Sequence, residues 1–206
     1  MQTLLQLNTS LYSDQGQSSQ LAQAYATQWQ ATHTHRQVVV RDLAKNPVAH
    51  LSAERFQAFT TKADQRTPPQ AAVVEESDQL INELKVADVL VIGLPMYNFG
   101  IASTLKAWID HVARAGQTFK YTDNGPVGLL ADRKTVLIAA RGGQYAGTAL
   151  DTQTAYVTTF LNFIGIRDIE FIYAEGLAMG NDVREHSLAQ AKAAITRQLS
   201  TLQSAA

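Results

Sequence analysis

Short apolar segments alternate with segments of helical periodicity along this chain of 206 residues. The apolar segments are residues 3–8, 37–42, 88–93, 135–140 and 169–174. Between them, apolar side chains recur at helical spacing, as at Leu21, Tyr25 and Trp29. Strands that alternate with helices form parallel sheets, which helices cover on both faces. The pattern predicts an α/β fold with a five-stranded parallel sheet, in a single domain over residues 1–206.

Capping and turn residues mark the ends of the expected helices. Ser52 is expected to cap a short helix, and the prolines after Thr67 are expected to begin a longer one. Gly165 fits the left-handed residue that often follows a last helical turn. Residues 117–126 depart from the alternation and contain Asn-Gly-Pro, which predicts an extended piece followed by a turn.

Composition limits the classes of function open to this chain. With 17 basic and 18 acidic residues the net charge is −1, which argues against a nucleic-acid surface or a polybasic membrane patch. Cysteine is absent, which excludes disulfides, thiolate nucleophiles and iron–sulfur clusters. No apolar run reaches the length of a membrane span. The first residues have neither a basic segment nor a long apolar stretch, so we expect no signal peptide. We expect a cytoplasmic protein with no nucleic-acid and no membrane partner.

The first candidate site segment is a serine-rich loop at residues 9–19, between a strand and a helix. Backbone N–H groups at the start of a helix bind anions, and the hydroxyls of Ser10 and Ser18 could complete a phosphate site. Serines in such a loop also serve as ordinary helix caps, and that alternative stays open. The loop lacks the glycine and lysine motifs of dinucleotide and nucleoside-triphosphate sites.

Two further loops follow the third and fourth strands and offer a different chemistry. The first contains Pro95, Met96, Tyr97, Asn98 and Phe99, a set that can hold a flat, partly polar ring. The second, at residues 141–143, is Arg-Gly-Gly, whose glycines let the backbone approach a ligand closely. A buried aromatic turn and a plain turn are the alternatives. Because ligands bind at the carboxyl ends of parallel strands, the three loops together indicate a flavin site.

The same loops resemble those of a known enzyme family. Residues 95–99, 105–106, 112–116 and 118–126 are similar to the FMN-dependent NAD(P)H:quinone and azobenzene oxidoreductases, the bacterial azoreductase family. The likeness extends to residues 40–44, 141–143, 160–166 and 174–176, and so covers nearly the whole chain.

The resemblance implies a flavodoxin-like fold and a homodimer with FMN bound at the subunit interface. The cofactor-binding positions it implies are Ser10, Gly16, Gln17, Ser18, Pro95, Met96, Tyr97, Asn98, Phe99, Ala140, Arg141, Gly142 and Gly143. Tyr121 and Phe163 are the implied substrate-binding residues, partly contributed by the partner subunit. Gly16 and Ala140 stand where relatives often carry serine, so hydroxyl contacts expected there must be absent or replaced by backbone N–H groups.

The implied reaction moves electron pairs by a ping-pong mechanism from NADH or NADPH to quinones and azo compounds. Flavin N5 carries the hydride, so no side chain is predicted to be catalytic. A flavodoxin-type electron carrier without its own nicotinamide and substrate site is the alternative function. A flavin-free structural or regulatory descendant is a second alternative.

The remaining polar and aromatic residues receive simpler interpretations. The histidines show no metal-ligand spacing beyond His33 and His35, so no metal site is predicted. His111 and Arg114 are expected in solvent, or else at the rim of the dimer interface. Trp108 is expected in the core or the interface. The extended piece with Tyr121 could also be a surface hairpin without a substrate role.

Overall fold

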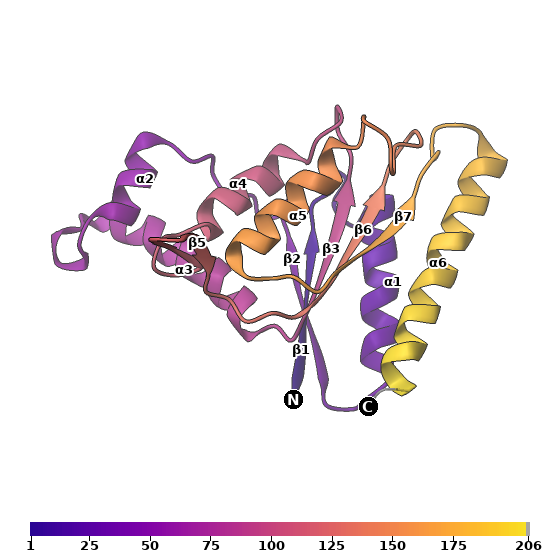
Figure 1. Ribbon diagram of the computed structural model, residues 1–206, viewed down its shortest axis with the longest axis horizontal. Helices are drawn as coiled ribbons and strands as arrows, with labels where there is room; N and C mark the ends of the chain where they lie inside the picture. Colours follow the sequence, from indigo (N-terminus) through magenta and orange to yellow (C-terminus); the bar gives the residue numbers. More distant parts are fainter. Residues whose placement is uncertain (205–206) are drawn as a thin grey trace.

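The central sheet has five parallel strands in the order β2-β1-β3-β6-β7 (Figure 1). The computed structural model describes residues 1–204, and side chains as far as residue 200. The strands are β1 (Gln2–Asn8), β2 (Arg36–Asp42), β3 (Val89–Pro95), β6 (Lys134–Ala140) and β7 (Ile169–Ala174). All five predicted strands are confirmed. The strand order reverses between β1 and β3, which is the arrangement of flavodoxin-like sheets.

Helices cover both faces of this sheet, as predicted (Figure 1). One face carries α1 (Gln17–Ala31) and α6 (Asn181–Ser204), while the other carries α3 (Pro68–Val86), α4 (Ser103–Val112) and α5 (Thr152–Ile164). Shorter helices are η1 (Ser13–Gln15), α2 (Ala53–Thr60) and η2 (Ala63–Gln65). In the described part of the chain, no helix combines the length and apolar character needed to cross a membrane.

Two hydrophobic cores hold the layers together, one on each face of the sheet. Tyr25 and Trp29 of α1 are buried between the sheet and α6. On the other face, Trp108 of α4 is buried and meets the ring of Phe160 edge-on, with ring centroids 6.4 Å apart. Each such side chain contributes about 1.5–3 kcal/mol by leaving water. Trp108 therefore belongs to the core of the protomer.

The predicted helix ends are confirmed by their local hydrogen bonds. The Ser52 hydroxyl accepts from the Arg55 N–H at 3.3 Å, and Thr67 forms a reciprocal capping box with Gln70. Gly165 has a φ of 109° and its N–H donates to the Asn162 carbonyl at 3.1 Å. A side chain in that left-handed conformation would be strained, so glycine is required there.

The extended piece is a hairpin of β4 (Phe119–Thr122) and β5 (Gly125–Gly128). Its second strand packs directly on the end of α5, since a Cβ on Gly128 would lie 2.2 Å from the Gly165 nitrogen. Tyr121, at 75% exposed, projects from the hairpin. The predicted extended piece and turn are thus confirmed.

His111 and Arg114 are buried, so the prediction that they lie in solvent was wrong. The segment with α2 folds over them and brings Phe59 against both, with the His111 ring 5.7 Å and the Arg114 guanidinium 5.0 Å from the Phe59 ring. Arg55 Nε donates to His111 Nε2 at 3.1 Å, and the opposite ring nitrogen pairs with the Ala107 carbonyl at 2.9 Å. This pattern fits only the neutral imidazole, because Nε2 must accept.

Burial lowers the pKa of His111, and the nearby Arg55 charge adds to that effect. The unfolded chain therefore takes up a proton on this ring near the ordinary value of 6.5, before the folded protein does. We expect the contribution of His111 to the free energy of unfolding to be constant above that pH and to fall below it, by up to about 1.4 kcal/mol per pH unit.

Urea unfolding at pH 7.5 and at about pH 5.5 measures this loss. In His111→Gln the loss of stability should be smaller, because the buried ring that must take up a proton has been removed. The other histidines are the same in both proteins, so the difference between the two losses reports on His111. An equal loss in the two proteins would contradict the assignment to His111.

Candidate functional site

Three loops meet at the carboxyl edge of the sheet, at the top of Figure 1. The loop after β1 is joined to β3 by the Thr9 hydroxyl, which donates to the Gly93 carbonyl at 2.7 Å. The loop after β3 is joined to β6 by the Met96 N–H, which donates to the Ala140 carbonyl at 3.1 Å. The structure therefore brings the three predicted segments together.

The serine-rich loop leads into α1 without a side-chain cap. Gly16 is the N-cap of α1, and no side-chain hydrogen bond closes this end among the described residues. The alternative that these serines cap the helix is therefore wrong. The hydroxyl of Ser18 is buried and has no hydrogen-bond partner within the described part of the chain. Leaving a buried hydroxyl unpaired costs about 1–3 kcal/mol, which an oxyanion placed there would recover.

Gly16 is required by its neighbour Ser10. A Cβ on Gly16 would lie 2.1 Å from the Ser10 hydroxyl oxygen, so the two side chains compete for one position. The Ser10 hydroxyl accepts from the Tyr12 N–H at 3.2 Å and is itself buried. Position 16 therefore supplies no hydroxyl, and the Ser10 side chain occupies the space that a side chain there would need.

The ring loop is a tight turn under backbone strain. The N–H groups of Tyr97 and Gly100 each donate to the other residue's carbonyl, at 3.0 and 2.9 Å. Between them, Asn98 and Phe99 have φ values of 49° and 65°. Asparagine tolerates this left-handed region, whereas phenylalanine seldom adopts it. Strain of this kind costs about 1–3 kcal/mol per residue and clusters at binding and active sites.

Tyr97 connects two of the loops. Its hydroxyl accepts from the Leu11 N–H at 3.1 Å and lies 3.4 Å from the Ser10 hydroxyl. The ring loop and the serine loop are therefore held at a set distance. Phe99 instead points outward and is half exposed.

The loop after β6 offers backbone atoms, because the Arg141 side chain is turned inward. Arg141 is buried and pairs with Asp151 at 2.8 Å and with Glu175 at 3.0 Å. Gly142 and Gly143 reach the surface beside the ring loop. A cavity of about 280 Å³ lies between the two loops, and its lining residues are Met96, Asn98, Phe99, Gly142, Gly143 and Tyr145.

Tyr145 is a site residue that the sequence did not reveal. Its ring meets Phe99 edge-on with centroids 5.6 Å apart. A Cβ on Gly143 would lie 2.7 Å from the Tyr145 ring, so the glycine allows this contact. An aromatic residue two positions after a glycine pair was the available signal.

Tyr121 and Phe163 lie away from this cavity in the same protomer. They form an aromatic cluster with Phe119, whose ring centroid is 4.3 Å from that of Phe163 and 5.5 Å from that of Tyr121. Thr152, at the opposite end of α5, bonds the Phe99 carbonyl. Phe163 is eleven positions further along that helix, or roughly 16 Å at about 1.5 Å per residue. One protomer does not bring the implied substrate residues to the ring loop.

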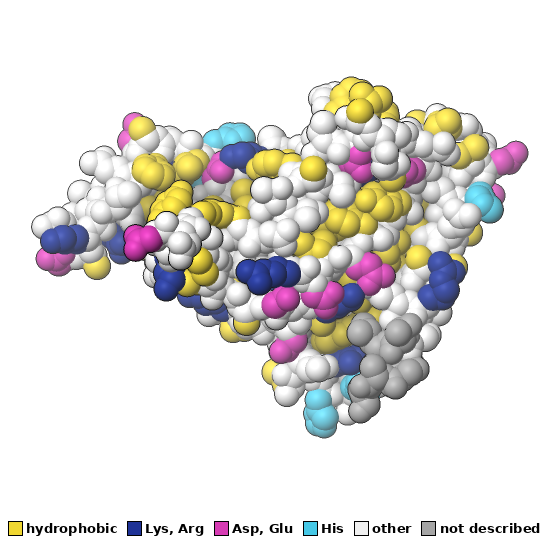
Figure 2. Space-filling model, viewed as in Figure 1, with side chains coloured by type: hydrophobic (Ala, Val, Ile, Leu, Met, Phe, Trp, Pro, Cys, Tyr) yellow, Lys and Arg dark blue, Asp and Glu magenta, His cyan; other side chains and the backbone are white. Residues whose placement is uncertain are grey.

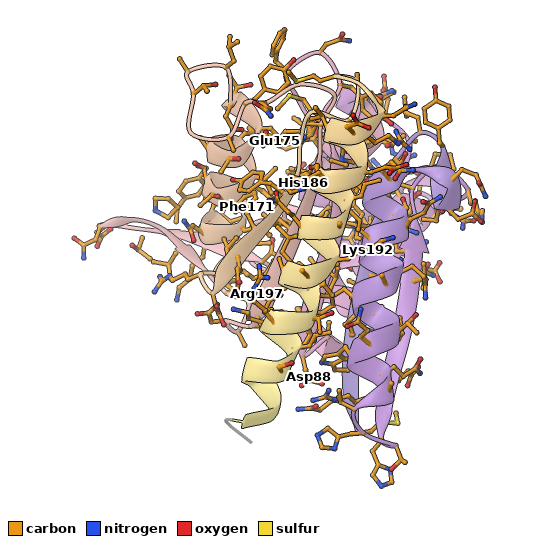
Figure 3. The ribbon with its side chains drawn as sticks, turned by 90° about the vertical axis from the view of Figure 1, so that its right-hand side faces the viewer. Asp88, Phe171, Glu175, His186, Lys192 and Arg197 are labelled. Carbon is orange, nitrogen blue, oxygen red and sulfur yellow. The ribbon has the colours of Figure 1, made fainter. Side chains whose placement is uncertain are left out.

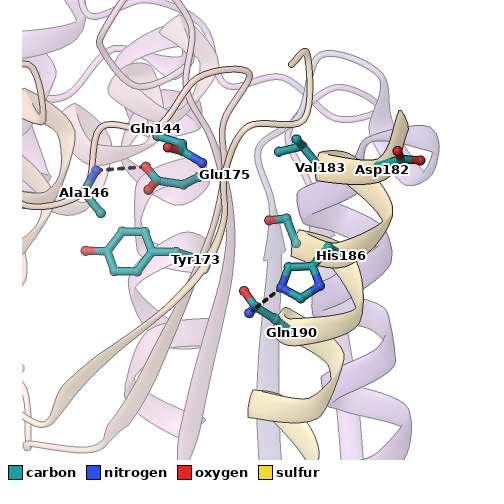
Figure 4. Close-up of a pocket in the computed structure, with 9 residues that line it drawn as sticks. Gln144, Ala146, Tyr173, Glu175, Asp182, Val183, His186 and Gln190 are labelled. Atoms are coloured by element: carbon teal, nitrogen blue, oxygen red, sulfur yellow. Dashed lines mark hydrogen bonds between the residues drawn. The ribbon is translucent and has the colours of Figure 1, made fainter. Parts of the chain in front are cut away.

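A larger hollow of about 830 Å³ lies between β7 and the start of α6 (Figure 4). Figure 3 shows Glu175 and Phe171 on the strand side, with His186 on α6. Over β7, hydrophobic side chains gather between α5 and α6 (Figure 2). The lining includes the carboxylate of Asp182, which would repel a phosphate, and that of Glu175, which is already paired with Arg141. The smaller cavity is the one that lies between the two predicted loops after β3 and β6. No cluster suited to a metal ion occurs among the described residues.

Known proteins resemble this chain in sequence and in fold. Residues 2–199 match the Flavodoxin_2 family, a flavodoxin-like fold. The FMN-dependent NADH:quinone oxidoreductase of Cellvibrio japonicus is 53% identical, over 97% of this chain and 99% of its own. The chain belongs to this flavodoxin-like family of FMN-dependent NADH:quinone oxidoreductases. The enzyme of that name from Alcanivorax borkumensis is 52% identical, over 92% of this chain and 96% of its own.

Solved structures of the family have the same architecture. An azoreductase from Bacillus anthracis superposes with a TM-score of 0.88 at 28% identity, covering 97% of this chain and 99% of its own. An FMN-dependent NADH-azoreductase of the same species, solved in complex with FMN, has a TM-score of 0.86 at 26% identity, with 97% and 100% covered. The resemblance seen in the sequence, and the fold it implied, are confirmed.

The competition between Ser10 and Gly16 predicts a coupled effect of substitution. Gly16→Ala should destabilise the protein by about 1–3 kcal/mol, because the new methyl group overlaps the Ser10 side chain. Adding Ser10→Gly should relieve the overlap. The free energies of unfolding of the wild type, both single variants and the double variant form a cycle. Additive effects within about 0.5 kcal/mol would contradict the prediction.

Proposed function

We propose that this chain is an FMN-dependent oxidoreductase that passes electron pairs from NADH or NADPH to quinones and to azo compounds. The observation that carries the proposal is the meeting of the ring loop, the Gly142–Gly143 loop and the uncapped start of α1. The names of the relatives support FMN as the cofactor, NADH as the electron donor and quinones as acceptors. The names of the structural neighbours support azo compounds as further acceptors.

The chain's own residues would hold the two ends of FMN by different means. Ser10, Gln17 and Ser18 would receive the phosphate, where N–H groups at a helix start favour an anion. Met96 and Phe99 would contact the ring, and the backbone N–H groups of Gly142 and Gly143 are available to its polar edge. Bound FMN supplies the centre that takes up and gives back hydride.

The site's openness suits a ping-pong order of substrates. Phe99 and Asn98 are exposed at the mouth of the cavity, so a flat molecule can enter and leave. We propose that the nicotinamide and then the acceptor occupy this same face in turn. The protein contributes position and exclusion of water rather than an acid or base. The names of the relatives favour NADH over NADPH.

A homodimer would complete the substrate pocket. Tyr121 is three-quarters exposed, and with Phe163 it lies at the far end of α5 from its own ring loop. We propose that these aromatic residues cover the ring site of the partner subunit. We also propose that the enzyme is cytoplasmic and that its chain forms a single FMN-binding domain. An exposed aromatic side chain such as Tyr121 is typical of protein interfaces.

An anaerobic absorbance titration of the FMN-loaded protein tests the proposal. NADH should bleach the flavin band with one equivalent per site, and a quinone or an azo dye should then restore it. The flavin is expected to be reduced because the open cavity admits the nicotinamide to the ring. Failure of both NADH and NADPH to bleach the flavin would favour an electron carrier, and failure to bind FMN would exclude both functions.

A further inference from the structure

Gln153 joins the two loops that line the proposed ring site. It is the second residue of α5 and is 1% exposed. Its side-chain Nε2 donates to the Pro95 carbonyl at 2.8 Å and to the Gly100 carbonyl at 3.3 Å. Its Oε1 accepts from Arg141 Nε, also at 3.3 Å. One amide therefore bonds both ends of the ring loop and the first residue of the loop after β6.

Arg141 is itself held firmly, so the Gln153 amide has a defined orientation. The guanidinium pairs with Asp151 and Glu175 and also donates to the Thr154 hydroxyl at 3.0 Å. It lies 5.1 Å from the ring centroid of Tyr173. A buried cation is stable only when it is paired and fully hydrogen-bonded, and these partners meet that requirement.

Glu175 extends the same network along the loop after β6. Its Oε1, which pairs with Arg141, also accepts from the N–H of Tyr145 at 2.9 Å. The same oxygen accepts from the N–H of Ala146 at 3.0 Å (Figure 4). The Gly143 carbonyl accepts from the N–H of Gly176 at 2.9 Å. The loop is therefore anchored on both sides of the exposed glycine pair.

Strain in the ring loop shows why such a bridge matters. Asn98 and Phe99 are left-handed, and that conformation persists only where the surroundings determine it strongly. Gln153 bonds the residues on either side of the strained turn, at Pro95 and Gly100. Without these bonds the turn can relax, and Asn98 and Phe99 would leave the cavity wall.

We propose that Gln153 is a positioning residue that holds the ring loop and the Gly142–Gly143 loop at the spacing that FMN requires. The inference rests on the proposed function, since it assumes that the ring lies between these loops. Gln153 does not line the cavity itself, and it acts through its hydrogen bonds to Pro95, Gly100 and Arg141. A role in fold stability alone would predict no specific effect on FMN.

Gln153→Met tests the proposal, because methionine has nearly the same length but lacks the amide. FMN affinity by fluorescence titration should fall at least tenfold, and the visible circular dichroism of bound FMN should change. Ser77→Ala is the matched control. Ser77 is also fully buried with two hydrogen bonds, to the His111 carbonyl and from Arg114, but it lies between α3 and α4. The control should lose stability while keeping FMN affinity and the spectrum.

Thr154→Val provides a second test should Gln153→Met fail to fold. It removes one acceptor of Arg141 at a half-buried position and should weaken FMN binding severalfold. Wild-type affinity and spectrum in the folded variants, or losses no larger than in Ser77→Ala, would overturn the positioning role. A wild-type protein that binds no FMN would instead overturn the proposed function.

Discussion

The pairing of β3 with β1 on one side and β6 on the other is the constraint on which the site depends. Asn8 pairs with Gly93, and Pro95 pairs with Ala140, so the three strands end at nearly the same level. The loops that follow must then share one edge of the sheet. A Cβ on Gly93 would lie 3.0 Å from the Ser18 carbonyl, so a glycine there lets α1 begin against the sheet. The position of the uncapped helix start thus follows from the strand register.

Polar side chains then hold the loops at this shared edge in a defined arrangement. Tyr97 ties the serine loop to the ring loop, and Gln153 ties the ring loop to Arg141. Each bond joins segments that are far apart in the sequence, and an unpaired group at any of these positions would cost about 1–3 kcal/mol. The site is therefore assembled before a ligand arrives, which lowers the ordering cost of binding.

The strands and loops could be predicted from sequence because their signals are local. Apolar runs, capping residues and the Pro-Met-Tyr-Asn-Phe segment lie within a few residues of the structures they indicate. Local signals could not predict three other features, namely the inward-facing side chain of Arg141, the burial of His111 and the hydrogen bonds by which Gln153 joins two loops. Each depends on partners from other segments, such as Glu175 for Arg141 and Arg55 for His111. Gly16 could be predicted only in part. The sequence showed a glycine where relatives often carry serine, but only the folded structure showed that a side chain there would overlap Ser10.

Hydrogen–deuterium exchange with and without FMN tests the central claim most directly, that three loops hold one ligand. The account predicts that amide exchange slows together in residues 16–18, 96–99 and 142–143 when FMN is added. Protection of only one of these segments, or protection confined to the hollow between β7 and α6, would contradict it.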